Sequence, residues 1–180
     1  MPTPHVLSVE PLTRSAFAPF GDVIQADGHT VHYSINEGNT ERFHDLAQID
    51  PGPQGRAIVS IFRGHARSLP FAIRMMERHP KASQAFIPLS GRPWLVVVAA
   101  RDTRPQAQNL RAFLCTAHQG VNYAPGVWHH PLLALQDTSD FLVIDRAGPG
   151  ENCDVVALAP HALLTPSEGR GLPHIGSTLQ

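Results

Sequence analysis

The sequence is poor in cysteine and lysine, and it has no long apolar run. Its two cysteines, Cys115 and Cys153, are too few for a disulfide framework and are typical of a protein from a reducing cytoplasm. Lys81 is the single lysine, so a Schiff-base mechanism would depend on that residue alone. No apolar run reaches the ~20 residues that span a bilayer, and no secretory signal is visible. We therefore expect a cytoplasmic protein without a membrane segment.

The charge of the chain is balanced, because 14 Lys and Arg residues face 15 Asp and Glu residues. This balance points to neither nucleic acid nor an anionic membrane as a partner. A chain of 180 residues can bury roughly two-thirds of the surface of its unfolded form, so one domain is the simplest organisation. We expect that domain at residues 1–165. Residues 166–180 are rich in Gly, Ser and Pro and are expected to form a flexible tail.

Seventeen prolines and fourteen glycines separate short apolar runs, a pattern typical of a β-sandwich or β-barrel. Residues 8–20 predict a strand followed by a short helix with Thr13 as its N-cap. Further strands are predicted at Ala57–Arg63, Gln84–Leu89, Trp94–Ala100, Ala112–Thr116, Leu132–Gln136 and Phe141–Asp145. The sequence therefore predicts a mainly β fold with a few short helices.

Polar residues of the kind that carry chemistry occur in two groups. Glu77, His79, Gln84 and Gly91 form the first group, and Pro125-Gly126-Val127-Trp128-His129 forms the second. In a strand Glu77 and His79 would point to one face, where a carboxylate and an imidazole can act as an acid–base pair or bind a divalent metal. The alternative is a surface position, since residues 75–79 also resemble a helix that ends before Pro80.

Several other polar residues stand at the ends of predicted strands. Adjacent strand residues face opposite ways, so at most one of His129 and His130 enters a barrel; the spacing selects His129. Arg63 suits a substrate carboxylate, because its planar fork can make two charge-assisted hydrogen bonds, but an ordinary surface arginine fits equally well. One of Asp145 and Arg146 is expected to form an ion pair at a sheet edge. Residues 41–45 are either a lid or a subunit contact.

The two groups together resemble the two-part signature of the cupins, which are small β-barrels with polar side chains projecting into one pocket. An acid replaces the usual first histidine, and an amide replaces the usual glutamate. More specifically, the chain from about Val6 to His161 resembles bacterial ureidoglycolate lyases, once called ureidoglycolate hydrolases. The matching segments are residues 20–24, 41–47, 77–80, 84–88, 120–123, 127–132, 140–142, 145–146 and 152–155.

This resemblance implies a cupin-like β-barrel, or double-stranded β-sandwich, that acts as a homodimer. It implies cleavage of (S)-ureidoglycolate to glyoxylate and urea during allantoin and purine nitrogen degradation, with nickel associated with some members. The chain departs from the family pattern at residues 50–55, at residues 124–126 and beyond about Thr165.

With that substrate in view, the residues receive expected roles. The catalytic candidates are His129 or Glu77 as the base and His79 as the acid. The substrate-binding candidates are Arg63 for the carboxylate, Gln84 for the ureido group, and Tyr123, Trp128 and Asp145. A metal would be held by Glu77, His79, Gln84 and His129, weakly because an amide is a poor ligand. A metal-dependent cupin oxygenase or isomerase and a non-catalytic small-molecule sensor are the two alternatives.

Overall fold

Fifteen strands and three short helices make up residues 4–165, the part of the chain that the computed structural model describes. The helices are α1 (Arg14–Phe17), η1 (Asn36–Gly38) and η2 (Ala107–Asn109). The strands are β1 (His5–Leu7), β2 (Val9–Pro11), β3 (Gly21–Ile24), β4 (His32–Ile35), β5 (Thr40–Phe43), β6 (Arg56–Gly64), β7 (Phe71–Arg78), β8 (Gln84–Pro88), β9 (Trp94–Ala99), β10 (Arg111–Cys115), β11 (Gly120–Tyr123), β12 (Trp128–His129), β13 (Leu133–Ala134), β14 (Ser139–Ala147) and β15 (Asp154–Leu164). The tail predicted at residues 166–180 lies outside the described residues.

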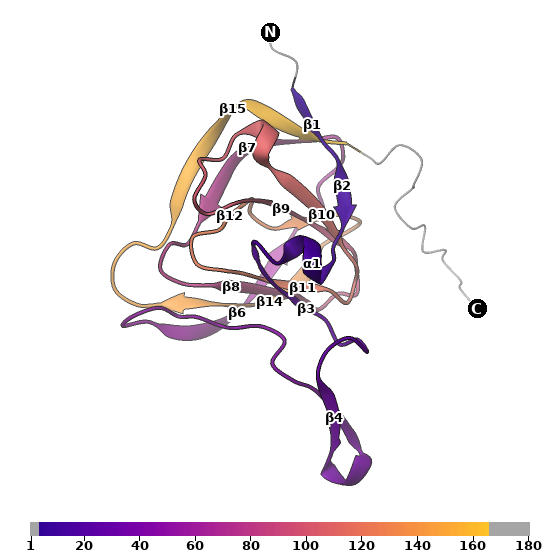
Figure 1. The fold of residues 1–180 in the computed structure, drawn as a ribbon. Coiled ribbons are helices and arrows are strands. Elements are labelled where there is room, and N and C mark those ends of the chain that lie inside the picture. Colours follow the sequence, from indigo (N-terminus) through magenta and orange to yellow (C-terminus); the bar gives the residue numbers. More distant parts are fainter. Residues whose placement is uncertain (1–3, 166–180) are drawn as a thin grey trace, which may run out of the picture.

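The strands form two large sheets and a separate two-stranded hairpin. The larger sheet has the order β1-β15-β7-β12-β9-β10-β2, with β13 also paired to β9. The smaller sheet has the order β3-β11-β8-β14-β6. In Figure 1 the β15 and β7 end of the larger sheet lies above β9 and β10, and the smaller sheet lies below them. This arrangement confirms the predicted mainly β, barrel-like fold.

Strand β9 is buried on both faces and separates two hydrophobic cores. Trp94, Val96 and Val98 face the core shared with the smaller sheet, which we call the inner core. The alternate residues of β9 face the second core, toward β7 and β15. Because each face must be apolar, the strand forms a continuous run of hydrophobic residues rather than an alternating one. The buried indole N–H of Trp94 donates a 3.0 Å hydrogen bond to the carbonyl of Gln119, so this large side chain leaves no donor unpaired.

Helix α1 closes one side of the inner core, and its start was predicted correctly. The Thr13 hydroxyl accepts a 3.2 Å hydrogen bond from the backbone N–H of Ala16, as an N-cap should. The helix buries Phe17 completely, and the Phe17 ring meets Phe113 edge-on at 5.8 Å. One short helical turn is thus fixed by a cap at its start and an aromatic contact at its end.

Most predicted strands are present, and the differences have physical causes. β6, β8, β9, β10 and β14 match the predictions to within a few residues, whereas the run at 132–136 keeps only β13. The helix-end alternative for residues 75–78 is wrong, since they lie in β7. β15 was not predicted. It contains Pro160 and its register with β7 shifts between Ala157 and Ala162, and an internal proline argues against a strand.

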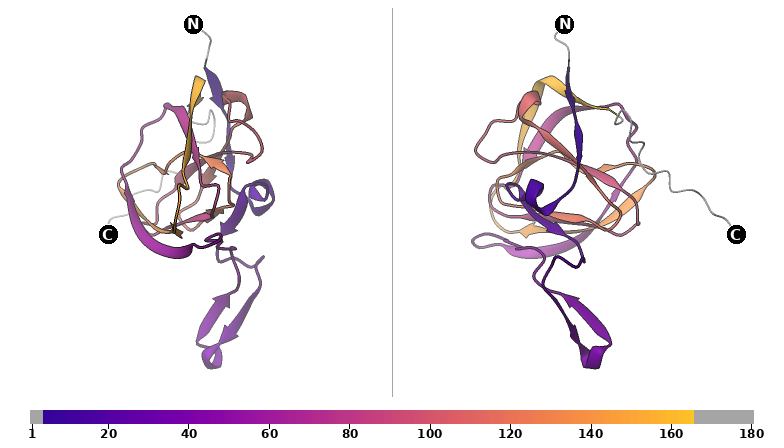
Figure 2. Two further views of the ribbon diagram at one scale, coloured as in Figure 1. Left: turned by 90° about the vertical axis from the view of Figure 1, so that its left-hand side faces the viewer. Right: turned by 45° about the vertical axis from the view of Figure 1, so that its right-hand side comes forward.

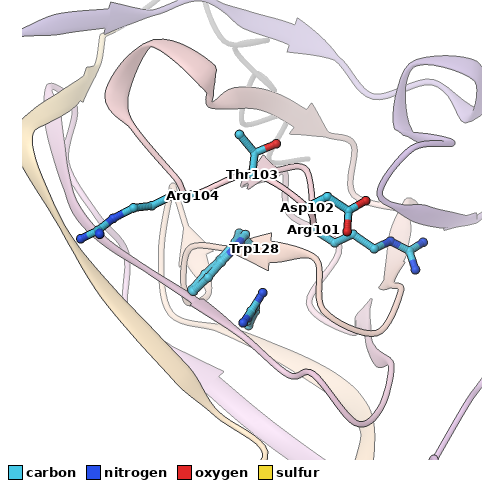
Figure 3. Close-up of a pocket in the computed structure, with 6 residues that line it drawn as sticks. Arg101, Asp102, Thr103, Arg104 and Trp128 are labelled. Carbon is cyan, nitrogen blue, oxygen red and sulfur yellow. The ribbon is translucent and has the colours of Figure 1, made fainter.

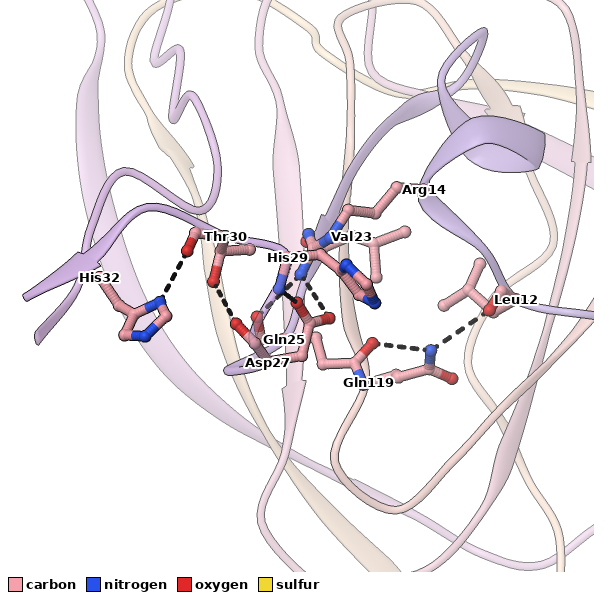
Figure 4. Close-up of polar contacts among 9 residues, drawn as sticks. All are labelled: Leu12, Arg14, Val23, Gln25, Asp27, His29, Thr30, His32 and Gln119. Carbon is pink, nitrogen blue, oxygen red and sulfur yellow. Dashed lines mark hydrogen bonds and ion pairs between the residues drawn. The ribbon is translucent and has the colours of Figure 1, made fainter. Parts of the chain in front are cut away.

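The β4–β5 hairpin extends away from both sheets, and we call residues 32–43 the arm (Figures 1 and 2). Its turn places Asn36 and Glu37 in the left-handed region, at φ 52° and 58°. The chain leading to the arm is held by Arg14, whose guanidinium donates to the carbonyls of Val23 and Gln25 and to the carboxylate of Asp27 (Figure 4). The arm therefore projects from a well-anchored base.

No helix in residues 4–165 is long and apolar enough to cross a membrane. The three helices of this part of the chain are each only three or four residues long.

Candidate active site

Both sheets contribute polar side chains to one end of the barrel interior. In the larger sheet, the two-residue strand β12 inserts between β7 and β9 and places His129 directly opposite Glu77. In the smaller sheet, β8 pairs with β11 so that Gln84 lies opposite Tyr123. The Tyr123 and His129 rings stack across the gap between the sheets. We call Glu77, His79, Gln84, Tyr123, His129 and Asp145 the barrel-end cluster.

Three members of this cluster are close enough to share a metal ion. Ligand atoms of Glu77, His79 and His129 all lie within 4.8 Å of one another. His129 Nε2 is 3.6 Å from a carboxylate oxygen of Glu77, and the two imidazole rings are 5.3 Å apart. Glu77 and His129, which are 52 positions apart in the sequence, therefore converge because β12 pairs with β7.

Backbone carbonyls fix the orientation of both imidazoles. The Nδ1–H of His129 donates to the carbonyl of Val127 at 3.0 Å, and the Nδ1–H of His79 donates to the carbonyl of Asn152 at 2.6 Å. Each ring then presents Nε2 to the cluster, and both Nε2 atoms are buried without a hydrogen-bond partner. A histidine whose Nδ1 is held in this way is the usual arrangement of a metal ligand.

A turn supports the same arrangement from the main chain. Gly126 has φ 79°, in the left-handed region that favours glycine, and its N–H donates a 2.9 Å hydrogen bond to the carbonyl of His79. The chain then enters β12 two residues later. The Pro125-Gly126 pair, which the sequence motif had singled out, therefore ties the segment carrying His129 to the residue that carries the second imidazole.

Burial shifts the ionisation of the cluster. It lowers the pKa of His129 to about 3, with a smaller contribution from the nearby His79. Burial also raises the pKa of the Glu77 carboxyl, an effect that His79 partly offsets. Because His129 is neutral at neutral pH, its 3.6 Å approach to Glu77 is not an ion pair there. The cluster thus contains a neutral imidazole with a free lone pair beside a carboxylate that holds a proton more firmly than usual.

Tyr123 forms one wall of the cluster. Its ring stacks on the His129 imidazole at a centroid distance of 4.3 Å and an angle of 7°. Burial, with further contributions from Cys115 and Glu77, raises the pKa of the Tyr123 hydroxyl well above its ordinary value, so the phenol stays protonated. The stack prevents the His129 ring from turning and keeps its Nε2 directed at Glu77 and His79.

The smaller sheet adds two hydrogen-bond acceptors without partners. Gln84 is buried, and its side-chain Oε1 has no hydrogen-bond donor among the described residues. The same is true of one carboxylate oxygen of Asp145, on the neighbouring strand β14. Neither Asp145 nor Arg146 forms the predicted ion pair in residues 4–165. Arg146 instead donates to the carbonyls of Pro51 and Pro53.

The structure does not bring Arg63 to the cluster, contrary to the prediction of a carboxylate anchor. Arg63 makes a two-pronged ion pair with Asp140, at 2.7 and 2.8 Å, and its side chain is 67% exposed. Its neighbour Phe62 is opposite the buried Phe141 and packs against Phe86, with ring centroids 5.9 Å apart, so Phe62 is on the inner face. Because alternate strand residues face opposite ways, Arg63 must point outward.

Trp128 also lies apart from the cluster, contrary to its predicted role in substrate binding. It is adjacent to His129 in β12, faces the opposite side of the sheet, and packs in the second core. The Arg78 guanidinium stacks on the Trp128 ring at 4.5 Å. Both residues line a cavity of about 450 Å³ together with residues 101–104 (Figure 3). This cavity is therefore separate from the barrel-end cluster.

The remaining candidates lie outside the cluster as well. His130 faces away from His129 and meets the Phe71 ring edge-on at 5.6 Å, so the spacing selected the inward histidine correctly. Lys81 is exposed, with its ammonium directed at the carbonyl of Pro149. Residues 41–45 lie at the end of the arm and beyond it. Sequence reasoning missed the carbonyls of Val127 and Asn152, which no side-chain pattern could reveal.

The residues of the cluster fit a divalent metal. Two unpaired imidazole Nε2 atoms and one carboxylate are ligands that suit zinc, iron, nickel or copper. Without a bound ion, the Nε2 atoms of His79 and His129 are buried polar atoms with no hydrogen-bond partner. The donor set alone does not choose among these metals.

Comparisons with known proteins agree on one family. The family model described as ureidoglycolate lyase matches residues 4–165. A ureidoglycolate lyase from Pseudomonas syringae pv. tomato is 54% identical over 151 residues, which cover 83% of this chain and 88% of that protein. One from Azotobacter vinelandii is 54% identical over 83% of this chain and 90% of its own length. One from Pseudomonas fluorescens is 51% identical over 87% of this chain and 99% of its own length.

Acid should destabilise the protein through His129. The unfolded chain takes up a proton near the ordinary pKa of 6.5, whereas folded His129 does so only near 3. The free energy of unfolding should therefore fall as the pH decreases from 6.5 to 3, by up to roughly 1.4 kcal/mol per pH unit from this residue. Guanidinium titrations of wild type and His129→Asn across this range test it. In His129→Asn the free energy of unfolding should depend less steeply on pH than in wild type, and the exposed control His65→Asn should behave as wild type. Equal slopes in His129→Asn and wild type would contradict this prediction.

Proposed function

The chain belongs to the ureidoglycolate lyase family, and we propose that it cleaves the carbon–nitrogen bond of (S)-ureidoglycolate to give glyoxylate and urea. The observation that carries this proposal is the family match over residues 4–165, which includes every member of the barrel-end cluster. The cluster supplies what such a cleavage needs, namely a carboxylate next to two oriented imidazoles in a buried place. A buried site suits a reaction that consumes no water.

The reaction is a net proton transfer within the substrate. The hydroxyl oxygen loses its proton and forms the aldehyde double bond to carbon, while the carbon–nitrogen bond breaks. The departing nitrogen keeps the bonding electrons and takes up a proton, so urea leaves. One side chain that first accepts a proton from oxygen and then gives one to nitrogen can serve both steps.

Glu77 suits this double role better than His129. Burial raises the pKa of Glu77, so its carboxylate is a stronger base than an ordinary glutamate and remains a usable acid once protonated. His129, with a pKa of about 3, is a weak base. His79, the predicted acid, has its Nδ1–H engaged by the Asn152 carbonyl and directs Nε2 inward. We therefore assign the proton transfer to Glu77.

We also propose that Glu77, His79 and His129 hold a divalent metal, with nickel the candidate that family resemblance suggests. Bound there, the ion would lower the pKa of the substrate hydroxyl and hold the substrate carboxylate. That second role is open because the cluster contains no lysine or arginine. One oxygen of Glu77 suffices as a ligand, which leaves the other for the proton. Gln84, the predicted fourth ligand, offers only a neutral amide oxygen, and we assign it to the substrate instead.

Two histidines and a carboxylate are also the donor set of non-haem iron oxygenases. The donor set therefore fits the oxygenase alternative too, and family membership decides against it. We further place the reaction in allantoin degradation and in the cytoplasm. Support for the compartment comes from the two free cysteines, Cys115 and Cys153, which are typical of reducing conditions.

We propose that the protein is a homodimer that associates through the outer face of the smaller sheet. Val59, Ile61 and Leu89 are 66%, 56% and 54% exposed there, and Leu142 and Ile144 lie opposite Ile61 and Val59 across β14. β6 is an edge strand of nine residues, a length that proteins usually cover. The arm extends below this sheet (Figures 1 and 2), where it can contact the second copy.

Replacement of Ile61 by glutamate tests the dimer. A charge in the middle of the proposed interface should shift the wild-type dimer to a monomer in analytical ultracentrifugation, with no change in melting of the barrel. Val155→Glu, at an exposed apolar position of the larger sheet, should leave the dimer intact. A dimer that persists in Ile61→Glu, or a wild-type protein that sediments as a monomer, would contradict this interface.

Release of urea and glyoxylate from racemic ureidoglycolate tests the proposed function. We expect both products in equal amounts, with half of the racemate consumed. Prior chelation should abolish this activity, and added nickel should restore it. Ammonia in place of urea would indicate an amidohydrolase, and a rate no higher than spontaneous decay would reject the substrate. Full activity after exhaustive chelation would reject the metal and leave the lyase assignment in place.

A further inference from the structure

We infer that Gln84 and Asp145 together recognise the ureido group by accepting its N–H hydrogen bonds. This inference rests on the proposed function and goes beyond it, because it names the part of the substrate that two particular residues select. The observation that carries it is a pair of buried acceptor atoms, Gln84 Oε1 and Asp145 Oδ1, neither of which has a donor in residues 4–165.

The two side chains share one face of adjacent strands. β8 and β14 are antiparallel, with Val143 opposite Phe86 and Ile144 opposite Ala85. Phe86 and Val143 both lie in the inner core. Two residues further along each strand come Gln84 and Asp145, which the alternation of side chains places on that same inner face. They are therefore neighbours at the end of the ladder, and Gln84 also lies opposite Tyr123 on its other side.

An acceptor that is buried without a donor costs the folded protein free energy. A ligand with N–H groups at this position would recover that cost, whereas a ligand without them would leave both oxygens unpaired. An ionised aspartate side chain accepts hydrogen bonds and donates none, and the amide oxygen of Gln84 likewise only accepts them. The pair therefore demands donors from the substrate.

The ureido group is the part of ureidoglycolate that supplies such donors. Its inner N–H and its terminal NH₂ lie along one edge and can meet two acceptors on neighbouring strands. The substrate carboxylate has no donor, and the hydroxyl has only the proton that is removed in the reaction. Asp145 is also not among the residues whose ligand atoms gather within 4.8 Å, so it remains available to the substrate.

This assignment predicts how the site discriminates between substrates. A site that hydrogen-bonds a substrate N–H strongly rejects an isostere that lacks it, because its own buried polar group is then left unpaired. Glyoxylate adducts that carry a methyl group in place of the terminal NH₂ should therefore bind poorly. The acceptor pair would make the enzyme selective for ureido compounds over other α-hydroxy acids.

Two stable ligands of nearly the same shape test this. Ureidoacetate has the ureido group and carboxylate of the substrate without its hydroxyl, and N-acetylglycine has a methyl group where ureidoacetate has NH₂. Calorimetry on the full-length protein as purified should show that wild type binds ureidoacetate about tenfold or more tightly than N-acetylglycine. The preference should fall to near unity in whichever of Asp145→Ala and Gln84→Ala removes the acceptor of the terminal NH₂. The other variant removes the acceptor of the inner N–H, which both ligands carry, and should weaken both ligands alike.

Asp140→Ala serves as the matched control, because it removes an acid from the same strand on the outer face. It should keep the full preference. Asp145→Asn covers the case in which Asp145→Ala does not fold, with a smaller effect of the same kind expected. An unchanged preference in folded Asp145 and Gln84 variants, or no preference in wild type, would overturn the inference. Because no turnover is measured, either result leaves the lyase assay to be judged separately.

Discussion

The pairing of β12 with β7 is the contact on which the site depends. It places His129 opposite Glu77, and the same short strand is held on its other side by β9. Without this register, the carboxylate and the imidazole would face different cores, since a slip of one residue reverses every side chain. Trp128 shows what the other register would bring, because it is adjacent to His129 and buried on the opposite side of the sheet. The chemistry of the cluster therefore follows from a two-residue strand.

Burial then gives the cluster its chemical character. The backbone carbonyls leave each imidazole with an Nε2 atom that has no hydrogen-bond partner, and the Tyr123 ring stacks on His129. Low solvent access keeps His129 neutral and raises the pKa of Glu77. These effects all favour a site that holds a metal and moves one proton. On the smaller sheet, acceptors without donors favour a ligand rich in N–H groups. In the proposed mechanism, the two sheets recognise different ends of one small molecule.

Much of this could be predicted from the sequence, and the failures have a common cause. The spacing of Glu77, His79 and Gln84, with the later His129, identified the cluster, because period-two alternation assigns each residue to a face. Alternation could not identify the inner face of β6, because both faces are apolar. Phe62 is on the inner face, opposite Phe141 and against Phe86, whereas Ile61 is on the outer face. Arg63 was therefore placed on the wrong side. The buried acceptor atom of Asp145 became visible only once the strands were paired.

Glu77 is the residue to which we assign the proton transfer, and replacing it with its amide is the sharpest experiment. Glu77→Gln keeps the shape of the side chain and removes its basicity. Urea and glyoxylate release should fall by about 100-fold or more. With both proteins stripped of metal by chelation, the melting temperature of the variant should stay at or above that of wild type because a buried charge has been removed. Glu151→Gln, an exposed control, should be fully active. A rate for Glu77→Gln within a few-fold of wild type would contradict the account.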